Sequence, residues 1–234
     1  MSAPNDRILR ANGPELAASP RARRGALRAD LARGHRCTGC GLIHADCLCA
    51  ALTAIPVRTR VALIIHRAEI RKSTNTGRLA ARLLAGAEIR LRGEHDPEAR
   101  TPLPEGRRLL LYPLPGARLL SPIDGHGEPP VLIVPDGNWP QARRAALRDP
   151  DAAGAEAVVL PPGPPSRYRL RAAPREDALS TMEAVARAMG ILEGAEVERR
   201  LMEAFDVFVA RSMRAAGRTP SSPADAVFDD DRSD

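Results

Sequence analysis

The chain has 234 residues, 44% of them apolar and 3% aromatic, so it is long enough for one substantial core built mainly from aliphatic side chains. No apolar run approaches the roughly 18 residues of a membrane-spanning helix, which argues against an integral membrane protein. The net charge is +6, and nearly all the positive charge is arginine, since Lys72 is the only lysine. Arginine suits phosphate recognition, but a GC-rich gene also produces an arginine-rich chain, so composition alone only permits a nucleic-acid partner.

Residues 1–35 are rich in arginine, glycine and proline, and we expect a loosely ordered basic arm. The arm contains no apolar segment of the kind that a secretory signal needs, so the sequence predicts a soluble cytoplasmic protein. Residues 217–234 are rich in proline and serine and then acidic, which is typical of a disordered tail. Between these ends we expect a small cysteine-containing module at 36–52 and a larger domain at 53–216.

All four cysteines lie in the segment "CTGCGLIHADCLC", with the spacing Cys37-x2-Cys40-x6-Cys47-x-Cys49. Four thiolates this close can surround one tetrahedral Zn²⁺. A redox pair of the C-x-x-C type is an alternative that leaves the second pair unexplained, and cysteines that only pack in a core are another. A site closed by four sulfurs has no open position for catalysis, so the predicted zinc is structural.

Short apolar segments alternate with amphipathic ones through the larger domain. Strands are expected over the segments 60–66, 87–93, 107–113, 129–136 and 155–162. Helices are expected over 74–86, 138–148, 180–190 and 194–217. This alternation predicts an α/β fold with a mainly parallel sheet flanked by helices, in which ligands bind beyond the carboxyl ends of the strands.

The stretch "VLIVPDGNWPQARR" combines an apolar strand with polar residues at its carboxyl end. Asp136 and the only tryptophan of the chain, Trp139, follow the strand directly. Asn138 is suited to cap the next helix. Trp139 either stacks on a ligand or packs on the sheet as an ordinary helix residue. Farther along, Ser180 and Glu183 have the capping-box spacing at the start of another helix.

Two other segments have both a functional and an ordinary structural interpretation. Residues 72–76 lead into a helix N-terminus, which can bind an anion, although serine, threonine and asparagine there can simply cap the helix. Pro113 and Pro115 follow a strand and predict either a rigid turn or a loop that lines a ligand.

The segment "PPSRYRLRAAP" places arginines on both sides of a tyrosine. Arg167, Arg169 and Arg171 alternate around Tyr168, a pattern that suits an RNA backbone with a stacked base. A solvated edge strand with alternating arginines is the equally simple alternative.

In order along the chain, "RCTGC…CLC", "HRAEIRKSTNTGRLA", "LYPLPGARLL", "DGNWPQARR", "YRLR" and "LSTMEA" resemble the successive motifs of the DTW-domain proteins, from about residue 36 to about residue 205. One such motif is a weak signal, but six in the right order make a specific match. The D-x-T-W motif of the family is here Asp136-Gly137-Asn138-Trp139, with asparagine in place of threonine. Asparagine preserves the capping role but has neither the hydroxyl nor the methyl group.

The resemblance implies a tRNA-uridine aminocarboxypropyltransferase. Such an enzyme moves the 3-amino-3-carboxypropyl group of S-adenosylmethionine to N3 of a uridine, here expected in the variable loop, and releases methylthioadenosine. The resemblance also implies a SPOUT-like fold with a C-terminal knot formed by loops near 112–117, 134–140 and 178–183. An S-adenosylmethionine-dependent RNA methyltransferase and a non-catalytic, zinc-containing RNA-binding protein are the alternatives. The sequence implies no obligatory protein partner.

These roles can be assigned to individual residues. Asp136 is the candidate base for the proton on N3, and it could instead bind the amino group of the cofactor. The residues expected to bind S-adenosylmethionine are Pro113, Pro115, Asp136, Gly137, Asn138, Trp139, Leu179, Ser180, Thr181 and Glu183. The residues expected to contact tRNA are Lys72, Asn75, Thr76, Arg143, Arg144, Arg167, Tyr168, Arg169 and Arg171.

Overall fold

The computed structural model describes residues 35–93, 101–170 and 178–217, and the described strands pair into one sheet. The order across the sheet is β2-β1-β5-β3-β6-β4, and the strands pair in parallel. This arrangement confirms the predicted α/β fold with a parallel sheet. The strands are β1 Arg60–His66, β2 Glu88–Arg92, β3 Arg108–Leu111, β4 Arg118–Leu119, β5 Val131–Asp136 and β6 Glu156–Val159.

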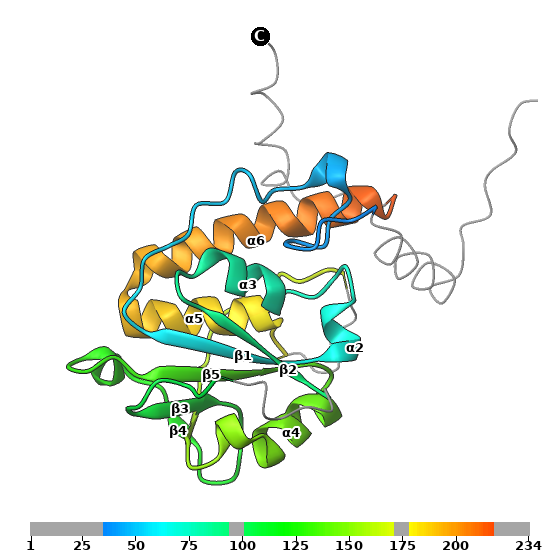
Figure 1. Ribbon diagram of the computed structural model, residues 1–234. Coiled ribbons are helices and arrows are strands. Elements are labelled where there is room, and N and C mark those ends of the chain that lie inside the picture. Colours follow the sequence, from blue (N-terminus) through cyan, green and yellow to red (C-terminus); the bar gives the residue numbers. More distant parts are fainter. Residues whose placement is uncertain (1–34, 94–100, 171–177, 218–234) are drawn as a thin grey trace, which may run out of the picture.

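Helices cover both faces of the sheet. Figure 1 shows α3, α5 and α6 on one side of it and α4 on the other. The four predicted helices are all present, whereas the short helix α2 and the two-residue strand β4 were not predicted. The helices are α2 Arg67–Ile70, α3 Gly77–Leu83, α4 Trp139–Arg148, α5 Thr181–Glu193 and α6 Ala195–Ala215, with 3-10 turns η1 His44–Asp46, η3 Pro122–Gly125 and η4 Pro150–Ala152.

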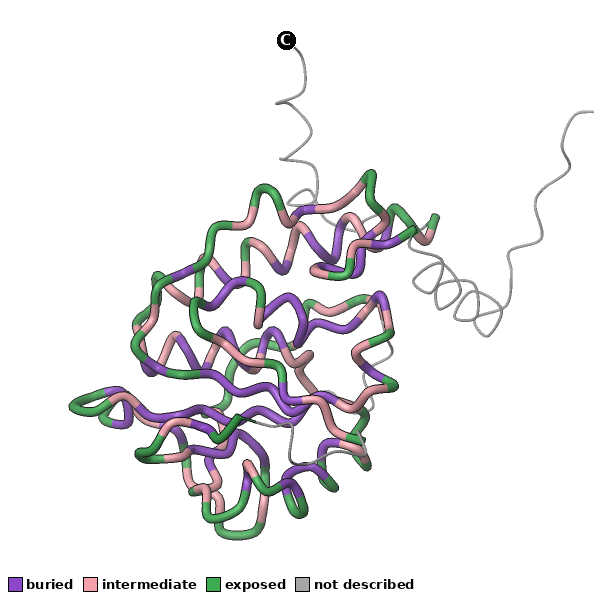
Figure 2. Tube along the Cα trace, viewed as in Figure 1, coloured by how far each residue is buried: buried purple, intermediate pink, exposed green. Residues whose placement is uncertain are grey.

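The two central strands are buried on both faces because helices pack against each side. Along β5, Leu132 and Val134 point into the core beneath α3, α5 and α6, while Val131 and Ile133 point into a second core beneath α4. Figure 2 shows buried residues running through the central strands. A strand that is covered on both faces has a continuous run of apolar residues, as in "VLIV". Each buried aliphatic side chain stabilises the fold by about 1.5–3 kcal/mol.

The cysteine-containing segment packs against the end of the domain formed by α6. Figure 1 shows this segment (blue) beside the C-terminal half of α6. Cys40, Leu42 and Leu48 are buried in the same core as Phe205. Arg211 of α6 donates to the carbonyl oxygens of residues 46 and 47, at 3.1 and 3.3 Å. The cysteine segment therefore shares a core with the sheet.

Some expectations from the sequence fall outside the described residues or stay untested. The predicted arm at 1–35 and the predicted tail at 217–234 lie outside the described residues except for His35 and Gly217. The C-terminal knot and the domain boundary after residue 52 stay predictions. Among the helices of the described ranges, none combines the length and the apolar character that crossing a bilayer requires.

Candidate functional site

Asp136 lies at the carboxyl end of β5, between β1 and β3 near the middle of the sheet. The register pairs it with Ile65 of β1, so it sits where neighbouring parallel strands end together. Ligands of open parallel sheets bind at this edge. The side chain is 7% exposed. The sequence-based expectation that Asp136 stands at a sheet-edge site is consistent with this position.

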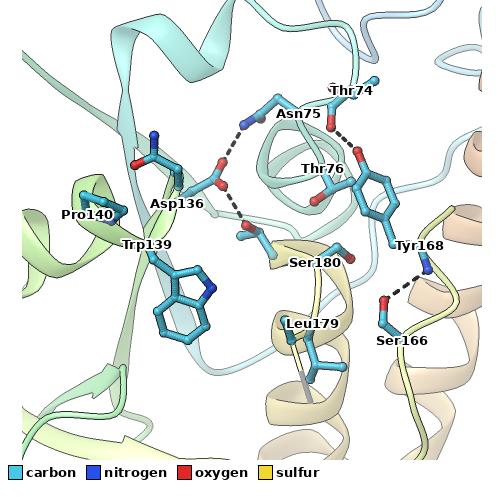
Figure 3. Close-up of a pocket in the computed structure, with 14 residues that line it drawn as sticks. Thr74, Asn75, Thr76, Asp136, Trp139, Pro140, Ser166, Tyr168, Leu179 and Ser180 are labelled. Atoms are coloured by element: carbon cyan, nitrogen blue, oxygen red, sulfur yellow. Dashed lines mark hydrogen bonds between the residues drawn. The ribbon is translucent and has the colours of Figure 1, made fainter. Parts of the chain in front are cut away.

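Two side chains from other parts of the chain, one in the loop before α3 and one at the start of α5, hold the Asp136 carboxylate. The amide Nδ2 of Asn75 donates to Oδ2 at 2.6 Å, and the hydroxyl Oγ1 of Thr181 donates to Oδ1 at 2.6 Å. Figure 3 shows both hydrogen bonds of the Asp136 carboxylate as dashed lines, with Asn75 labelled on one side of it. Because each oxygen is held from a different side, the carboxylate has a defined orientation.

The carboxylate also approaches the backbone at the start of α3. A Cβ atom on Gly77, the first residue of α3, would overlap Oδ2 of Asp136. Only glycine allows this approach, because any side chain would displace the carboxylate or the helix. Gly77 was not singled out from the sequence, although the glycine directly after the polar run 72–76 was the signal that could have identified it.

A cavity of about 500 Å³ opens beside Asp136. Its walls come from residues 74–76, from 136–140, from Ser166 and Tyr168, and from 178–181. A second cavity of about 400 Å³ shares Gly137, Trp139 and residues 178–181 with the first. Most residues that line the second cavity are apolar, and those that lie on strands belong to β3, β5 and β6. Each is within the usual size range of a small-molecule site.

Trp139 stands where the two cavities adjoin. It lines both of them and is 42% exposed. Its ring lies 6.1 Å from that of Tyr112, with an interplanar angle of 55°. Of the two interpretations from the sequence, the exposed face fits stacking on a ligand better than burial against the sheet.

The N-termini of α4 and α5 both lie at the cavity, because the capping residues Asn138 and Ser180 start these helices there. Asn138 caps α4, because its Oδ1 accepts from the N–H of Gln141 at 3.0 Å. In the reciprocal bond, Oε1 of Gln141 accepts from the N–H of Asn138 at 2.9 Å. Ser180 and Glu183 form the predicted capping box at the start of α5. Asparagine therefore fills the capping role at the position where the DTW motif has threonine. Helix N-termini carry partial positive charge, which favours anionic groups.

Glu183 holds one wall of the cavity rather than lining it. It is 2% exposed and accepts hydrogen bonds from Ser166 Oγ at 2.7 Å and from the N–H of Arg167 at 2.6 Å. Tyr168 then crosses to donate its hydroxyl to the carbonyl oxygen of Thr74 at 2.6 Å. A buried acid with backbone and hydroxyl donors fixes the segment 166–168 against the loop 74–76.

The residues proposed for the cofactor from the sequence are distributed unevenly around the two cavities. Seven of them line the first cavity: Asp136, Gly137, Asn138, Trp139, Leu179, Ser180 and Thr181. Pro113 lines only the second cavity. Pro115 and Glu183 line neither cavity. Ser166 and Pro140 line the first cavity and were not predicted, because only the folded chain brings residue 166 next to residue 180.

The residues proposed for tRNA differ in how far their charges are already compensated. Arg143 and Arg144 are exposed on α4, and within the described residues neither side chain has a hydrogen-bond or ion-pair partner. Arg167 pairs with Asp206 at 2.8 Å, and Lys72 pairs with Glu69. Arg169 donates to the carbonyl oxygen of Ser166 at 2.8 Å.

The remaining tRNA candidates lie in or beside the cavity, with one exception. Asn75 and Thr76 are buried, and both line the cavity. Thr76 Oγ1 accepts from the N–H of Met182 at 3.3 Å. Tyr168 lines the cavity as well. Arg171 lies outside the described residues.

The four cysteines converge on one point. Their sulfur atoms all lie within 4.8 Å of one another, with Cys37 and Cys49 at 3.6 Å and Cys40 and Cys47 at 3.8 Å. A tetrahedral Zn²⁺ with Zn–S bonds of about 2.3 Å places neighbouring sulfurs about 3.8 Å apart. The cluster therefore has the ligand set and the spacing of a site that could hold a metal ion, and all four residues are free thiols.

The protonation of these thiols shows what a cation would change. Burial raises the pKa of Cys49 to about 12, and the neighbouring sulfurs of Cys37 and Cys40 add to the rise. Burial also opposes ionisation of Cys37, but the backbone N–H of Cys40 and other hydrogen-bond donors outweigh it and lower the pKa of Cys37 to about 6. Four adjacent thiolates require a compensating cation, and metal binding would release protons.

The fold and the site together define an α/β protein with a ligand pocket at the carboxyl edge of a parallel sheet and a four-cysteine cluster beside it. The family model of the DTW domain matches residues 34–213, and the chain belongs to the DTW-domain family. No solved structure matches the chain significantly.

The chain is similar to three proteins called tRNA-uridine aminocarboxypropyltransferase 2. It is 30% identical over 170 residues to the one from Drosophila melanogaster. This match covers 69% of this chain and 68% of the Drosophila protein. It is 31% identical over 171 residues to the one from Macaca fascicularis and 30% identical over 171 residues to the one from Mus musculus. The latter two matches cover 69% of this chain but 57% of each relative.

Proposed function

We propose that this protein transfers the 3-amino-3-carboxypropyl group of S-adenosylmethionine to N3 of a uridine in tRNA, with the variable loop as the expected location. The observation that carries the proposal is the fixed carboxylate of Asp136 in the wall of the first of two adjoining cavities, in a chain whose similar proteins bear the name of this activity. Two cavities suit a reaction between two ligands, and Trp139, which lines both, marks where they would meet.

The second cavity fits the adenosine half of the donor, because most of its lining residues are apolar and residues 178–181 form part of its wall. The first cavity has more polar residues in its lining, Asn75 and Asp136 among them, and fits the aminocarboxypropyl group together with the uridine. The N-terminus of α5 at Thr181 and that of α4 at Trp139 favour a carboxylate there.

Asp136 is assigned to the cationic part of the donor. S-adenosylmethionine supplies a sulfonium whose bond to the aminocarboxypropyl carbon breaks as the carbon–N3 bond forms, while N3 loses its proton. A carboxylate that Asn75 and Thr181 hold in one orientation suits a stationary ammonium or sulfonium of opposite charge. Removal of the N3 proton by Asp136 is the competing role, and it requires the carboxylate to contact the uridine.

The tRNA backbone is assigned to α4 rather than to the segment 167–169. Arg143 and Arg144 carry exposed charges that no carboxylate of the described residues compensates, whereas Arg167 is paired with Asp206. Exposed cations without partners suit phosphate groups and should produce salt-dependent binding. Replacing both Arg143 and Arg144 by alanine should lower the salt slope of tRNA affinity by about 1–2. The Arg167→Ala variant is the matched comparison, and a larger effect there would reverse the assignment.

We also propose that Cys37, Cys40, Cys47 and Cys49 bind one structural Zn²⁺. The sulfur spacing and the ligand set support this assignment. Elemental analysis of the full-length protein should find about one zinc ion per chain. Normally folded protein without bound metal would contradict the assignment.

The reaction itself is tested by its by-product. Purified protein is incubated with S-adenosylmethionine and unmodified tRNA, and the nucleosides are separated by mass spectrometry. Methylthioadenosine together with aminocarboxypropyluridine is the expected result. S-adenosylhomocysteine would indicate a methyltransferase instead, and no turnover with retained tRNA binding would indicate the non-catalytic alternative.

A further inference from the structure

Arg78 is a buried arginine whose charge the proposed activity does not use. It lies on α3, its side chain is 6% exposed, and it has no carboxylate partner within the described residues. A buried guanidinium without an opposite charge is costly. A compensating group is therefore expected nearby.

The groups that face Arg78 belong to the cysteine cluster. A Cβ built on Gly41 would lie 3.1 Å from Nη1 of Arg78, and Gly41 directly follows Cys40. Burial lowers the pKa of Arg78, and the nearby Cys40 and Cys37 act in the opposite direction. Four thiolates around one divalent cation leave a net charge of −2, so the bound centre is a partly buried anion that a cation beside it stabilises.

The backbone of Arg78 leads in the other direction, to the pocket. Its N–H donates to Oδ1 of Asn75 at 2.9 Å, and Nδ2 of the same Asn75 donates to Asp136. The cysteine turn also lies close to this loop, because a Cβ built on Gly41 would lie 3.0 Å from the carbonyl oxygen of Ser73. One residue thus joins the cysteine cluster and the Asp136 carboxylate through a single intervening side chain.

We propose that Arg78 is a positioning residue that compensates the charge of the metal–thiolate centre and thereby holds Asn75 and Asp136 in place. This inference rests on the zinc site and the donor site of the proposed function. Without the metal–thiolate centre, Arg78 has no opposite charge beside it among the described residues. The start of α3 and Asn75 then lose one of the forces that fix them.

The first test measures metal affinity, which does not depend on turnover. Zinc affinity of the full-length protein is determined by competition with a chromophoric chelator for Arg78→Met, Arg78→Lys and the control Arg82→Met, an exposed arginine one turn further along α3. We expect Arg78→Met to bind zinc about tenfold or more weakly, since groups around metal ligands typically contribute 10–100-fold. Arg78→Lys should stay within about threefold because it keeps the charge, and Arg82→Met should match the wild type.

Two outcomes of this test would overturn the proposal. One is an Arg78→Met variant that binds zinc as tightly as the wild type. The other is an Arg78→Lys variant that loses as much affinity as Arg78→Met, which would show that packing and not charge matters. If Arg78→Met does not fold, the lysine variant still decides between charge and packing.

The second test follows the pocket in the wild-type protein while the metal is removed. Trp139 is the only tryptophan and lines both cavities, so its emission reports on the pocket. We expect the emission to shift as chelator removes zinc and to return when zinc is added back. Unchanged emission over complete zinc removal would sink the coupling to the pocket. A wild-type protein that binds zinc but not S-adenosylmethionine would refute the proposed reaction while leaving the Arg78 and zinc result intact.

Discussion

Asn75 donates to Asp136 through one end of its amide and accepts from the N–H of Arg78 through the other, at 2.6 and 2.9 Å. A single buried side chain therefore ties the carboxylate at the end of β5 to the first turn of α3. Asn75 is 61 residues away in sequence from Asp136 and 3 residues away from Arg78.

Replacing Asp136 by asparagine tests whether its charge anchors the donor. The amide keeps the shape but loses the charge-assisted contacts, each worth about 1.5–3 kcal/mol, so S-adenosylmethionine should bind roughly 10–100-fold more weakly. Isothermal titration calorimetry measures this directly. The Glu105→Gln variant, which changes an exposed acid away from the cavities, is the matched control. Unchanged donor affinity with a large loss of turnover would instead support the role as base for N3.

Gly77→Ala is expected to disrupt the site by overlap. The new methyl group would collide with Oδ2 of Asp136, and such overpacking costs about 1–3 kcal/mol when the neighbours must move. Thermal unfolding should show a lower midpoint, and donor affinity should fall with it. Gly163→Ala is the control, because there a methyl group meets only the flexible end of Arg187. A Gly77→Ala protein with wild-type donor affinity would contradict the close approach.

Asn138→Thr tests the departure from the D-x-T-W motif. The asparagine caps α4 through Gln141, and threonine can form the same cap at a cost of a few tenths of a kcal/mol. We therefore expect Asn138→Thr to retain the unfolding midpoint and the turnover. Asn138→Ala should lose about 1 kcal/mol of unfolding free energy, measured by urea denaturation. If Asn138→Thr raised turnover several-fold, the threonine would have a role beyond capping.

Acid is expected to weaken a charge cluster at the β4 edge of the sheet. Arg118 and then Arg107 lower the pKa of Glu156 to about 2 from its usual 4.5, and Arg118 holds the pKa of buried Asp124 well below its ordinary value. Because the folded pKa of Glu156 is depressed, its stabilising effect is complete above about pH 4.5 and is lost as the pH falls towards 2.

The Glu156→Gln variant makes that pH dependence measurable. Its unfolding midpoint should lie below that of the wild type at neutral pH, and the difference should shrink between pH 4.5 and 2. Glu156 and both arginines are partly exposed, so high salt should also reduce the difference. Glu105→Gln, which removes an exposed acid with no ion pair in the described ranges, should show no such convergence. A difference that grew on acidification would contradict the assigned pKa shift.

The sequence predicted what is encoded locally. The five expected strands and four expected helices are present, because continuous apolar runs and helical spacing report burial on the two faces of a sheet. The caps at Asn138 and Ser180 were visible because a capping box needs only residues three positions apart. Strand β4 was missed because two residues are too few for any periodicity.

The architecture of the site was less accessible, because it depends on contacts between distant segments. No local pattern shows that Asn75 meets Asp136, or that Glu183 holds residues 166 and 167. Arg78 looked like any helix arginine in sequence, and only the fold buries it beside the cysteine turn. The order of the motifs identified the segments that line the cavity. The roles of Glu183 and Tyr168 in supporting the cavity wall could be inferred only from their hydrogen-bond partners in the structure.

The pocket wall joins the beginning and the end of the domain. The N–H of Met182 donates to Oγ1 of Thr76 across 106 residues of sequence, and the first cavity needs both segments. Because chains emerge from the ribosome N-terminus first, the loop 74–76 cannot form its hydrogen bond with Met182 until α5 has been synthesised. During that interval the apolar faces of β1 and β5 have no cover from α5 and α6. Nascent chains stalled before residue 181 should therefore be the species that chaperones retain.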